Sequence, residues 1–431
     1  MHIFFSGIGG TGIGPLALVA KQAGYTVSGS DKQDSLYIDY LRKHDIHDIA
    51  IGQSYEAIAA AHRQEPIDWY VYSSAVGIEQ PNAPEFTFCR ENGIRMSKRD
   101  ELLNEIITEK NLKLLAIAGT HGKTTTTAMA IWLAKQLKMP IGYILPAKSS
   151  FADMGGLDAG AEYFIYECDE FDRNFLHYNP EISVITGIDW DHPDIYPTRE
   201  DYNQAFRDFL GQSSTSIVWQ SDTERLGGTA SEQDTLLLDA DERIAKITLA
   251  GEVNRRNAWQ VAHAFAQMTD KPVAELLPLL EAFPGVARRF EKLAPGLYSD
   301  YAHTPPKIRG ALQLGHEVAG ENLVVVYEGL HNTRQHFITD ELKDLFSDVK
   351  QLYIVPSYRA REDENLEDLT PAKLRELMSE QTQAHTTASL LNDELKLAIQ
   401  NHLNVGDTVL CLTAGGGGSL DEWLRTVVKD I

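Results

Sequence analysis

The sequence predicts an α/β protein with mainly parallel sheets. Strand-like apolar runs alternate with helix-like runs along the whole chain, as in proteins built from βαβ units. Two of the strand-to-helix junctions carry glycine-rich turns that can surround phosphate groups. A chain of 431 residues is too long for one hydrophobic core, so we expect two or three such α/β units.

The first unit opens with a strand at residues 3–6, and a glycine-rich turn and a helix through residues 16–20 follow it. The turn reads Gly7-Ile8-Gly9-Gly10-Thr11-Gly12, and Asp31 ends the next strand about twenty residues later, which matches the dinucleotide-binding fingerprint. A further strand at residues 69–72 ends at Ser73-Ser74. Because such a turn accepts a diphosphate whatever molecule carries it, a dinucleotide and a UDP-sugar both fit. A turn that only packs a helix onto the sheet is the structural alternative.

The second unit carries the most informative motif, a phosphate loop. We expect the charged segment 105–113 to be a linker into this unit. An apolar strand at residues 114–118 leads into Gly119-Thr120-His121-Gly122-Lys123-Thr124-Thr125, and an apolar helix follows. Two residues separate the glycines, where the full P-loop pattern has four. Lys123 can meet the terminal phosphates and the Thr124 hydroxyl can bind Mg²⁺, so ATP is favoured over a simple glycine turn.

Carboxylates follow the next two strands of this unit. The first group begins at Glu167, after the strand 164–166, and the second runs from Asp189 to Asp194 and includes His192. Ligands of parallel sheets bind at the carboxyl ends of the strands, and Mg²⁺ prefers oxygen ligands. We therefore interpret Glu167 as a magnesium ligand, with a solvated acidic loop as the alternative. His192 is a candidate for a second magnesium ion or for orienting phosphates.

Two further motifs admit both a functional and a structural interpretation. Asn254 and Asn257 are three residues apart, so they share a helix face and could bind an adenine edge or cap the helix. The adjacent Arg288 and Arg289 could clamp a phosphate or form a surface pair. The composition becomes loop-like near residues 283–285, and a third α/β unit begins near Leu297.

Composition excludes several functional classes. The formal net charge of −23 argues against nucleic acid as a bulk partner, because phosphate contacts need basic surface. The three cysteines lie far apart without metal-ligand spacing, which suits a reducing compartment. The first residues lack the features of a signal peptide, and no apolar run reaches the length of a membrane span. We expect a cytoplasmic protein, either a monomer or a homodimer.

Taken in order, these motifs resemble those of the Mur ligases, ATP-dependent enzymes that extend the peptidoglycan peptide. The resemblance covers about the whole chain, and its markers include Arg288-Arg289-Phe290-Glu291 and Asp300-Tyr301-Ala302-His303. It implies a three-domain Mur ligase architecture. A Rossmann-like UDP-sugar domain would span residues 1–108, a central P-loop ATPase α/β domain 109–284, and a Rossmann-like amino-acid domain 285–431.

The resemblance also implies roles for individual residues. The UDP-sugar would contact Gly9, Gly10, Thr11, Gly12, Asp31, Ser73 and Ser74. ATP would contact residues 119–125, Asn254, Asn257, Arg289 and Asp300. Thr124, Glu167 and His192 would serve magnesium, and the amino acid would meet Tyr301, His303, His331 and Arg334. The residues expected to act in catalysis are Lys123, Glu167, His192, Arg289 and His303, the last either accepting a proton or orienting a carboxylate.

Within the family the chain is most similar to the branch that joins L-alanine to the lactyl carboxylate of UDP-N-acetylmuramate through an acyl phosphate. The absence of lysine between His192 and Leu210 agrees with this branch, whereas several sister ligases have a carbamylated lysine there. Two departures are Val253, where relatives have histidine, and His331, where an arginine is usual. The pair Asn332-Thr333 is closer to the ligase that attaches a recycled tripeptide, L-Ala-γ-D-Glu-meso-diaminopimelate. An NAD(P)-dependent oxidoreductase and a non-enzymatic nucleotide sensor stay as more distant alternatives.

Overall fold

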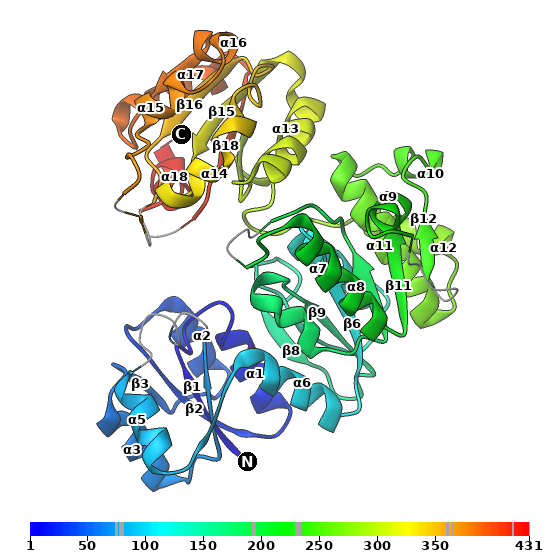
Figure 1. The fold of residues 1–431 in the computed structure, drawn as a ribbon, viewed down its shortest axis with the longest axis vertical. Helices are drawn as coiled ribbons and strands as arrows, with labels where there is room; N and C mark the ends of the chain where they lie inside the picture. Colours follow the sequence, from blue (N-terminus) through cyan, green and yellow to red (C-terminus); the bar gives the residue numbers. More distant parts are fainter. Residues whose placement is uncertain are drawn as a thin grey trace. The chain divides into compact units, whose positions relative to one another are not determined.

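A computed structural model of the protein describes residues 1–73, 76, 82–191, 195–228, 234–358, 362–363, 365–415 and 418–430. These residues form three predominantly parallel sheets, which confirms the predicted α/β class and its three-part architecture. Along the chain the first sheet is blue, the second cyan to green, and the third yellow to red (Figure 1). The chain divides into two compact units, residues 1–241 with 257–283 and residues 242–256 with 284–431. The first unit holds the first two sheets.

The first sheet has five parallel strands in the order β3-β2-β1-β4-β5. Its strands are β1 (His2–Ser6), β2 (Thr26–Asp31), β3 (Ile49–Ile51), β4 (Trp69–Tyr72) and β5 (Arg95–Lys98). Its helices are α1 (Gly14–Gln22), α2 (Leu36–Lys43), α3 (Tyr55–Gln64), α5 (Pro84–Glu91) and α6 (Arg99–Glu109). The strand order reverses between β1 and β4, and ligands of open α/β sheets bind at such a switch point. The glycine turn after β1 and Ser73 after β4 therefore flank the expected ligand position.

The predicted linker at residues 105–113 is wrong. Helix α6 continues to Glu109, and strand β6 already begins at Lys113. Ile106 and Ile107 are buried, because they continue an apolar helix face that begins at Leu102 and Leu103. Charged residues alternate with these apolar positions, so the segment is interpreted as a linker and its amphipathic helix is missed.

The second sheet has seven strands in the order β12-β11-β10-β6-β9-β7-β8, and only the edge pair β7–β8 is antiparallel. Its strands are β6 (Lys113–Ala118), β7 (Ile141–Ile144), β8 (Gly155–Leu157), β9 (Tyr163–Glu167), β10 (Ile182–Ile185), β11 (Thr215–Trp219) and β12 (Thr235–Leu237). Its helical elements are α7 (Lys123–Gln136), the 3₁₀ helix η1 (Phe171–His177), α8 (Arg199–Gln212), α9 (Gln220–Arg225), α11 (Glu252–Thr269) and α12 (Val273–Glu281). Strand β6 is apolar and lies between β9 and β10. The phosphate loop follows its carboxyl end and therefore lies near the carboxyl ends of β9 and β10.

One apolar cluster runs through both sheets of the first unit. It joins β1 and α1 residues such as Phe5 and Leu16 to β9 and α8 residues such as Phe164 and Phe206. The contact is close, since a Cβ added at Gly155 of β8 would lie 2.8 Å from the carbonyl oxygen of Pro15 in α1. The two sheets therefore share a hydrophobic core.

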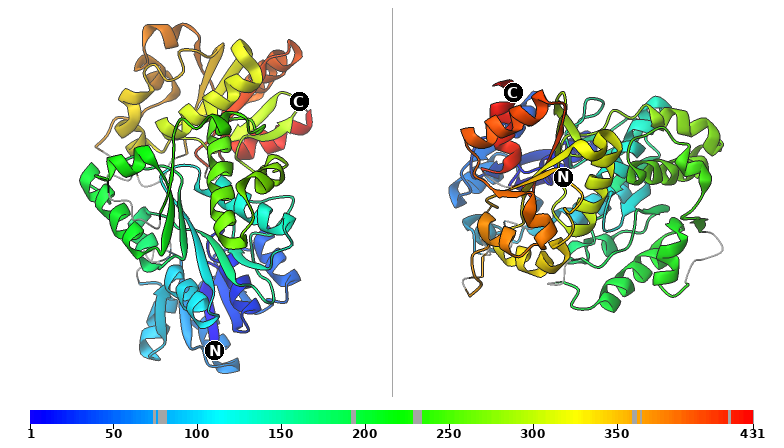
Figure 2. Two further views of the ribbon diagram at one scale, coloured as in Figure 1. Left: turned by 90° about the vertical axis from the view of Figure 1, so that its right-hand side faces the viewer. Right: turned by 90° about the horizontal axis from the view of Figure 1, so that it is seen from above.

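The third sheet forms the second unit and has the order β13-β14-β18-β15-β16-β17, with only β13–β14 antiparallel. Its strands are β13 (Glu291–Ala294), β14 (Leu297–Asp300), β15 (Leu323–Glu328), β16 (Gln351–Val355), β17 (Thr386–Ala388) and β18 (Thr408–Leu412). Its helical elements are α10 (Glu242–Ala245), α13 (Pro305–Ala319), η2 (Gly320–Asn322), α14 (Asn332–Leu342), α15 (Pro371–Glu376), α16 (Glu380–Ala384), α17 (Asp393–Asn404), α18 (Leu420–Val427) and η3 (Val428–Asp430). In Figure 2 helices flank the strands of this unit, coloured yellow to red. Because β14, β18 and β15 are parallel neighbours, their carboxyl ends lie at one edge.

Two expectations from composition can be compared with the structure. Cys89, Cys168 and Cys411 are all buried and carry free thiols. Among the described residues, no helix has both the length and the apolar character needed to cross a bilayer.

Candidate active site

The phosphate loop follows β6, and its conformation depends on two glycines and on a backbone hydrogen bond to the segment after β10. Gly119 and Gly122 have φ values of 128° and 78°, which side chains disfavour. A Cβ at Gly119 would lie 2.5 Å from the Thr186 hydroxyl, so only glycine fits there. The Thr120 amide donates to the Gly187 carbonyl at 2.8 Å, which ties the loop to the residues after β10. Gly122 is the N-cap of α7, whose N-terminus can receive an anion.

Lys123 lies beside this loop with its side chain only 12% exposed, and it is paired with a carboxylate that the sequence analysis did not single out. Its Nζ donates to Glu170 Oε2 at 2.5 Å and to the Gly119 carbonyl at 2.7 Å, and it lies 3.7 Å from Asp169 Oδ1. Burial alone would lower the pKa of Lys123, but the charges of Glu170, Asp169 and Glu167 outweigh burial and raise it. Lys123 is thus a fixed cation at the start of α7.

The acidic segment after β9 is not a solvated loop. Glu170 is fully buried, and its backbone carbonyl accepts a hydrogen bond of 2.6 Å from the Tyr196 hydroxyl. Glu167 ends β9, in register with Ile117 of β6. This register places the Glu167 carboxylate beside the strand that leads into the phosphate loop.

The residues expected to hold magnesium fit the ion chemically. Thr124 is buried in the first turn of α7, and Glu167 ends the neighbouring strand, so a hydroxyl and a carboxylate oxygen come from adjacent elements. Within the described ranges no three histidine, cysteine or acidic side chains form a protein-only metal site. Mg²⁺ usually takes one or two protein oxygens together with phosphate and water. His192 lies outside the described residues.

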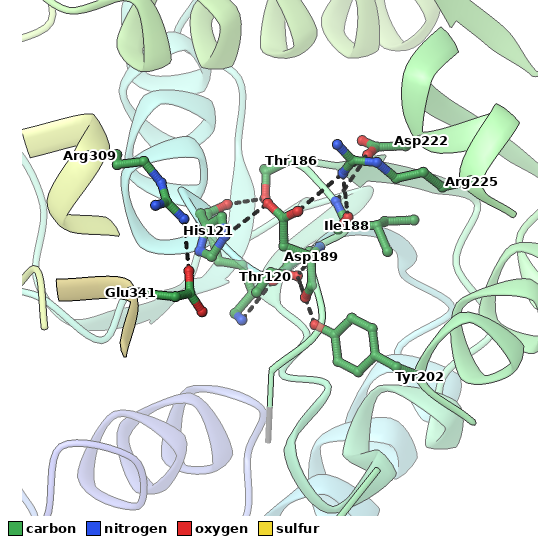
Figure 3. A network of polar contacts seen from close by, with 12 residues as sticks. Thr120, His121, Thr186, Ile188, Asp189, Tyr202, Asp222, Arg225, Arg309 and Glu341 are labelled. Atoms are coloured by element: carbon green, nitrogen blue, oxygen red, sulfur yellow. Dashed lines mark hydrogen bonds and ion pairs between the residues drawn. The ribbon is translucent and has the colours of Figure 1, made fainter. Parts of the chain in front are cut away.

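A polar network connects the phosphate loop to the residues after β10 (Figure 3). His121 Nε2 lies 3.2 Å from Asp189 Oδ2, and Arg225 Nη1 donates to Asp189 Oδ1 at 3.2 Å. Thr120 Oγ1 donates to the Asp189 carbonyl at 2.7 Å and accepts from the Asp189 amide at 2.8 Å. Asp189 therefore fixes two consecutive loop residues at once.

Asp222 belongs to the same network through Ile188 and Arg225. Its buried Oδ1 accepts from the Ile188 amide at 3.1 Å and lies 3.5 Å from Arg225 Nη1. Burial raises the pKa of Asp222 to about 6, although the Ile188 amide and Arg225 act in the opposite direction. This carboxyl group is consequently sensitive to mildly acidic pH.

The two asparagines of α11 have different surroundings. A Cβ added at Gly122 would lie 3.1 Å from Asn257 Oδ1, so the Asn257 amide lies against the phosphate loop. Its Nδ2 is buried and has no hydrogen-bond acceptor among the described residues. A bound nucleotide can satisfy such a donor. Asn254 Nδ2 instead donates to the Ala250 carbonyl at 2.9 Å, which is a local bond at the helix start.

The first glycine turn is stabilised by residues at the ends of β1 and β2. Asp31 Oδ2 accepts from the Gly9 amide at 2.8 Å, so Asp31 holds the turn itself. The buried Glu85 accepts from the Ser6 and Ser30 hydroxyls at 2.6 and 2.5 Å and joins the two strand ends. Ser73 lies beside the turn, 3.5 Å from the position of a Cβ at Gly7, whereas Ser74 lies outside the described residues.

In the second unit, Arg288, Arg289 and Asp300 form one cluster with Tyr301. Asp300 Oδ2 accepts from the Phe290 amide at 2.7 Å, and the Arg288 and Arg289 guanidinium groups lie 4.5 and 5.2 Å from the Tyr301 ring centre. Burial raises the pKa of Asp300 to about 6, against the effect of Arg289. The structure therefore brings Arg289, Asp300 and Tyr301 together.

The other residues expected to bind the amino acid lie at the same sheet edge. The His303 ring centre is 4.7 Å from that of Tyr301 after β14, and His331 precedes α14 after β15. Glu362 accepts from the Asn332 and Thr333 amides at 3.3 and 3.1 Å, so a carboxylate of the chain occupies the N-terminus of α14. Arg334 lies in the first turn of that helix.

Comparisons with known proteins found two family models and a set of relatives that match this chain. Residues 2–111 match the family model described as "Mur ligase family, catalytic domain", and residues 117–255 match "Mur ligase middle domain". The chain is 30% identical over 396 residues to a UDP-N-acetylmuramate–L-alanine ligase of Paenarthrobacter aurescens, with 84% of each chain covered. It is 28% identical to the enzyme of that name from Renibacterium salmoninarum, covering 100% of this chain and 97% of that one.

Solved structures show the same fold. A UDP-N-acetylmuramate–alanine ligase from Thermotoga maritima superposes with a TM-score of 0.76 at 22% identity, covering 100% of this chain and 99% of the other. A murein peptide ligase from Psychrobacter arcticus superposes with a TM-score of 0.65 at 21% identity, with the same coverage.

Proposed function

The chain belongs to the Mur ligase family, and from this premise we propose that it joins L-alanine to UDP-N-acetylmuramate with conversion of ATP to ADP and phosphate. The placement of Lys123 carries this proposal. A largely enclosed cation at the N-terminus of α7, held by carboxylates that follow β9, is suited to the terminal phosphates of ATP. Because the chain belongs to the Mur ligase family, the oxidoreductase hypothesis is abandoned.

The proposed reaction begins with transfer of the γ-phosphoryl group to the lactyl carboxylate of UDP-N-acetylmuramate. Two anions must approach each other in this step, so positive charge is needed where they meet. Lys123 supplies charge from the first turn of α7, and the family resemblance adds Arg289 as a second candidate cation. The amine of L-alanine then attacks the acyl phosphate, the tetrahedral intermediate loses phosphate, and an amide forms.

Magnesium is the metal that the residues of the site fit. When bound, it would neutralise phosphate charge, with Thr124 and Glu167 as its candidate protein ligands. Asn257 would meet the nucleotide through its unsatisfied amide donor beside the phosphate loop.

The incoming amino acid has its candidate residues at the carboxyl ends of β14 and β15. His303 stacks edge-on against Tyr301 and would accept a proton from the ammonium group or orient the carboxylate of alanine. His331 and Arg334 would bind the carboxylate. We further propose domains at residues 1–108, 109–284 and 285–431 and a cytoplasmic location, where ATP and the uridine sugar are available.

The pair Asn332-Thr333 no longer favours the tripeptide-recycling activity, because both side chains have structural contacts. Asn332 is buried, its Oδ1 accepts from the Leu369 amide at 2.8 Å, and its Nδ2 donates to the Glu367 carbonyl at 3.0 Å. Thr333 Oγ1 accepts from the Asp363 amide at 2.8 Å. These contacts stabilise the loop before α15, so Asn332 and Thr333 have a structural explanation.

The test is product mass spectrometry after incubation with ATP, Mg²⁺, UDP-N-acetylmuramate and a panel of acceptors. The panel contains L-alanine, L-serine, glycine and L-Ala-γ-D-Glu-meso-diaminopimelate. We expect the L-alanine amide and stoichiometric ADP. Product formed with the tripeptide alone would reject the proposal.

A further inference from the structure

The glycine turn after β1 offers few free hydrogen-bond donors. The amides of Gly7 and Ile8 donate to the Ser30 carbonyl at 2.8 and 3.0 Å, and the Gly9 amide donates to Asp31. The next amides that donate within the turn, those of residues 10, 13 and 14, also have carbonyl acceptors. Among the described residues only the Thr11 and Gly12 amides of this turn remain without an acceptor.

Two neutral amides are a weak match for a diphosphate, which carries about two negative charges. Charge-assisted hydrogen bonds are about twice as strong as neutral ones, so a site for this group gains most from a nearby cation. The fold places such a cation against the last glycine. A Cβ added at Gly12 would lie 2.3 Å from Nη1 of Arg99, so the guanidinium occupies the space that a side chain at Gly12 would fill.

Arg99 lies next to Asp100, but its guanidinium makes no hydrogen bond with that carboxylate. Its Nε lies 3.7 Å from Asp100 Oδ2, which is too long for a hydrogen bond. Asp100 is itself fixed, because its Oδ1 accepts from the hydroxyls of Tyr178 and Tyr166 at 3.1 and 3.2 Å. Within the described part of the chain neither Nη of Arg99 donates a hydrogen bond, and its side chain is 31% exposed. A ligand at the turn can therefore reach the guanidinium.

We propose that Arg99 binds the diphosphate of the uridine sugar, together with the amides of Thr11 and Gly12. The inference rests on the proposed function and assigns one further substrate-binding residue to it. Arg99 begins α6, which follows β5 of the first sheet, whereas Asp100 bonds to tyrosines of the second sheet. The same short segment thus contacts the sugar nucleotide and anchors the sheet that carries the phosphate loop.

The test measures binding of uridine, UDP, UDP-N-acetylglucosamine and UDP-N-acetylmuramate by titration calorimetry. We expect Arg99→Gln to weaken binding of the three diphosphates by a common factor of about 10 to 100, and to leave uridine unaffected. Arg99→Lys should lose less, since it keeps the charge. Arg63→Gln, which removes an exposed arginine of α3, is the matched control and should bind like the wild type.

Gly12→Ala gives an independent measurement that leaves Arg99 in the chain. Its methyl group would displace the guanidinium, so it should weaken UDP binding while keeping the fold, and it serves if Arg99→Gln does not fold. Equal UDP affinity in wild type and both variants overturns the inference. So does a loss confined to UDP-N-acetylmuramate, because the guanidinium would then contact the lactyl carboxylate. If the wild type binds no uridine nucleotide, the proposed function fails as well.

Discussion

Replacing Glu170 with glutamine should show that the Lys123–Glu170 pair contributes to stability as well as to the site. Nζ and Oε2 lie 2.5 Å apart, and the side chains are only 12% and 1% exposed. Removing one partner of a buried pair commonly costs about 3–5 kcal/mol, because the other charge loses its compensation. Here Lys123 keeps the Gly119 carbonyl and Asp169, so we expect about 2–3 kcal/mol for Glu170→Gln.

The assay is urea unfolding followed by fluorescence and circular dichroism, with thermal unfolding as a second measure. A loss of this size corresponds to a midpoint lower by roughly 5–10 °C. The matched control is Glu162→Gln, since Glu162 pairs with Lys113 at a similar 2.7 Å but both side chains are 63% and 45% exposed. We expect that control to change stability by less than about 0.5 kcal/mol, as for exposed pairs.

A double-mutant cycle separates the pair from its surroundings. Lys123→Met leaves Glu170 buried, and adding Glu170→Gln should recover part of the loss, with a coupling energy of at least about 1 kcal/mol. If Glu170→Gln unfolds like the wild type, or if the two single losses simply add, the assignment of a buried, mutually dependent pair is refuted.

Three further predictions follow from the same site. Lys123→Ala should lower kcat for ADP formation by about 10² to 10³ with every acceptor, because a charge at the transferred phosphoryl group is lost, and normal turnover in a coupled ADP assay would contradict this. Asp189→Asn should raise KM for ATP at unchanged far-ultraviolet dichroism, because His121 and Arg225 lose their shared carboxylate. The matched control variant is Asp208→Asn, on the exposed side of α8. Since burial raises the pKa of Asp222 to about 6, the folded state holds that proton more tightly than the unfolded state. The unfolding free energy of wild type relative to Asp222→Asn should therefore fall by about 3 kcal/mol as pH rises from about 4 to 6, and a pH-independent difference would argue against it.

Local patterns predicted the strands and turns well. The β1 strand, the glycine turn and the phosphate loop follow from short apolar runs and glycine spacing, which fix the backbone within a few residues. The sequence predicts a functional role for the acidic segment after β9, with Glu167 as the metal ligand, and this role stays a prediction. Which of its carboxylates pairs with Lys123 depends on the side-chain direction after β9, and Glu170 proved to be the partner.

Long-range contacts escaped the sequence analysis for a physical reason. Arg99 lies 87 positions from Gly12 in the chain, and only the parallel order of β1, β4 and β5 brings the two together. No spacing rule connects such residues. The linker prediction at residues 105–113 failed similarly, because the apolar face of α6 is recognised only when its partner sheet is known.

Because the first two sheets share a hydrophobic core, we expect them to unfold together as one cooperative unit. The sugar and ATP motifs nevertheless lie in separate halves of this unit. A chimera that exchanges only residues 1–108 with a sister enzyme inherits mismatched surfaces along α1 and β8, whereas exchanging both sheets together preserves them. Protease cuts near Glu109 should accordingly yield fragments that stay associated until the whole unit unfolds.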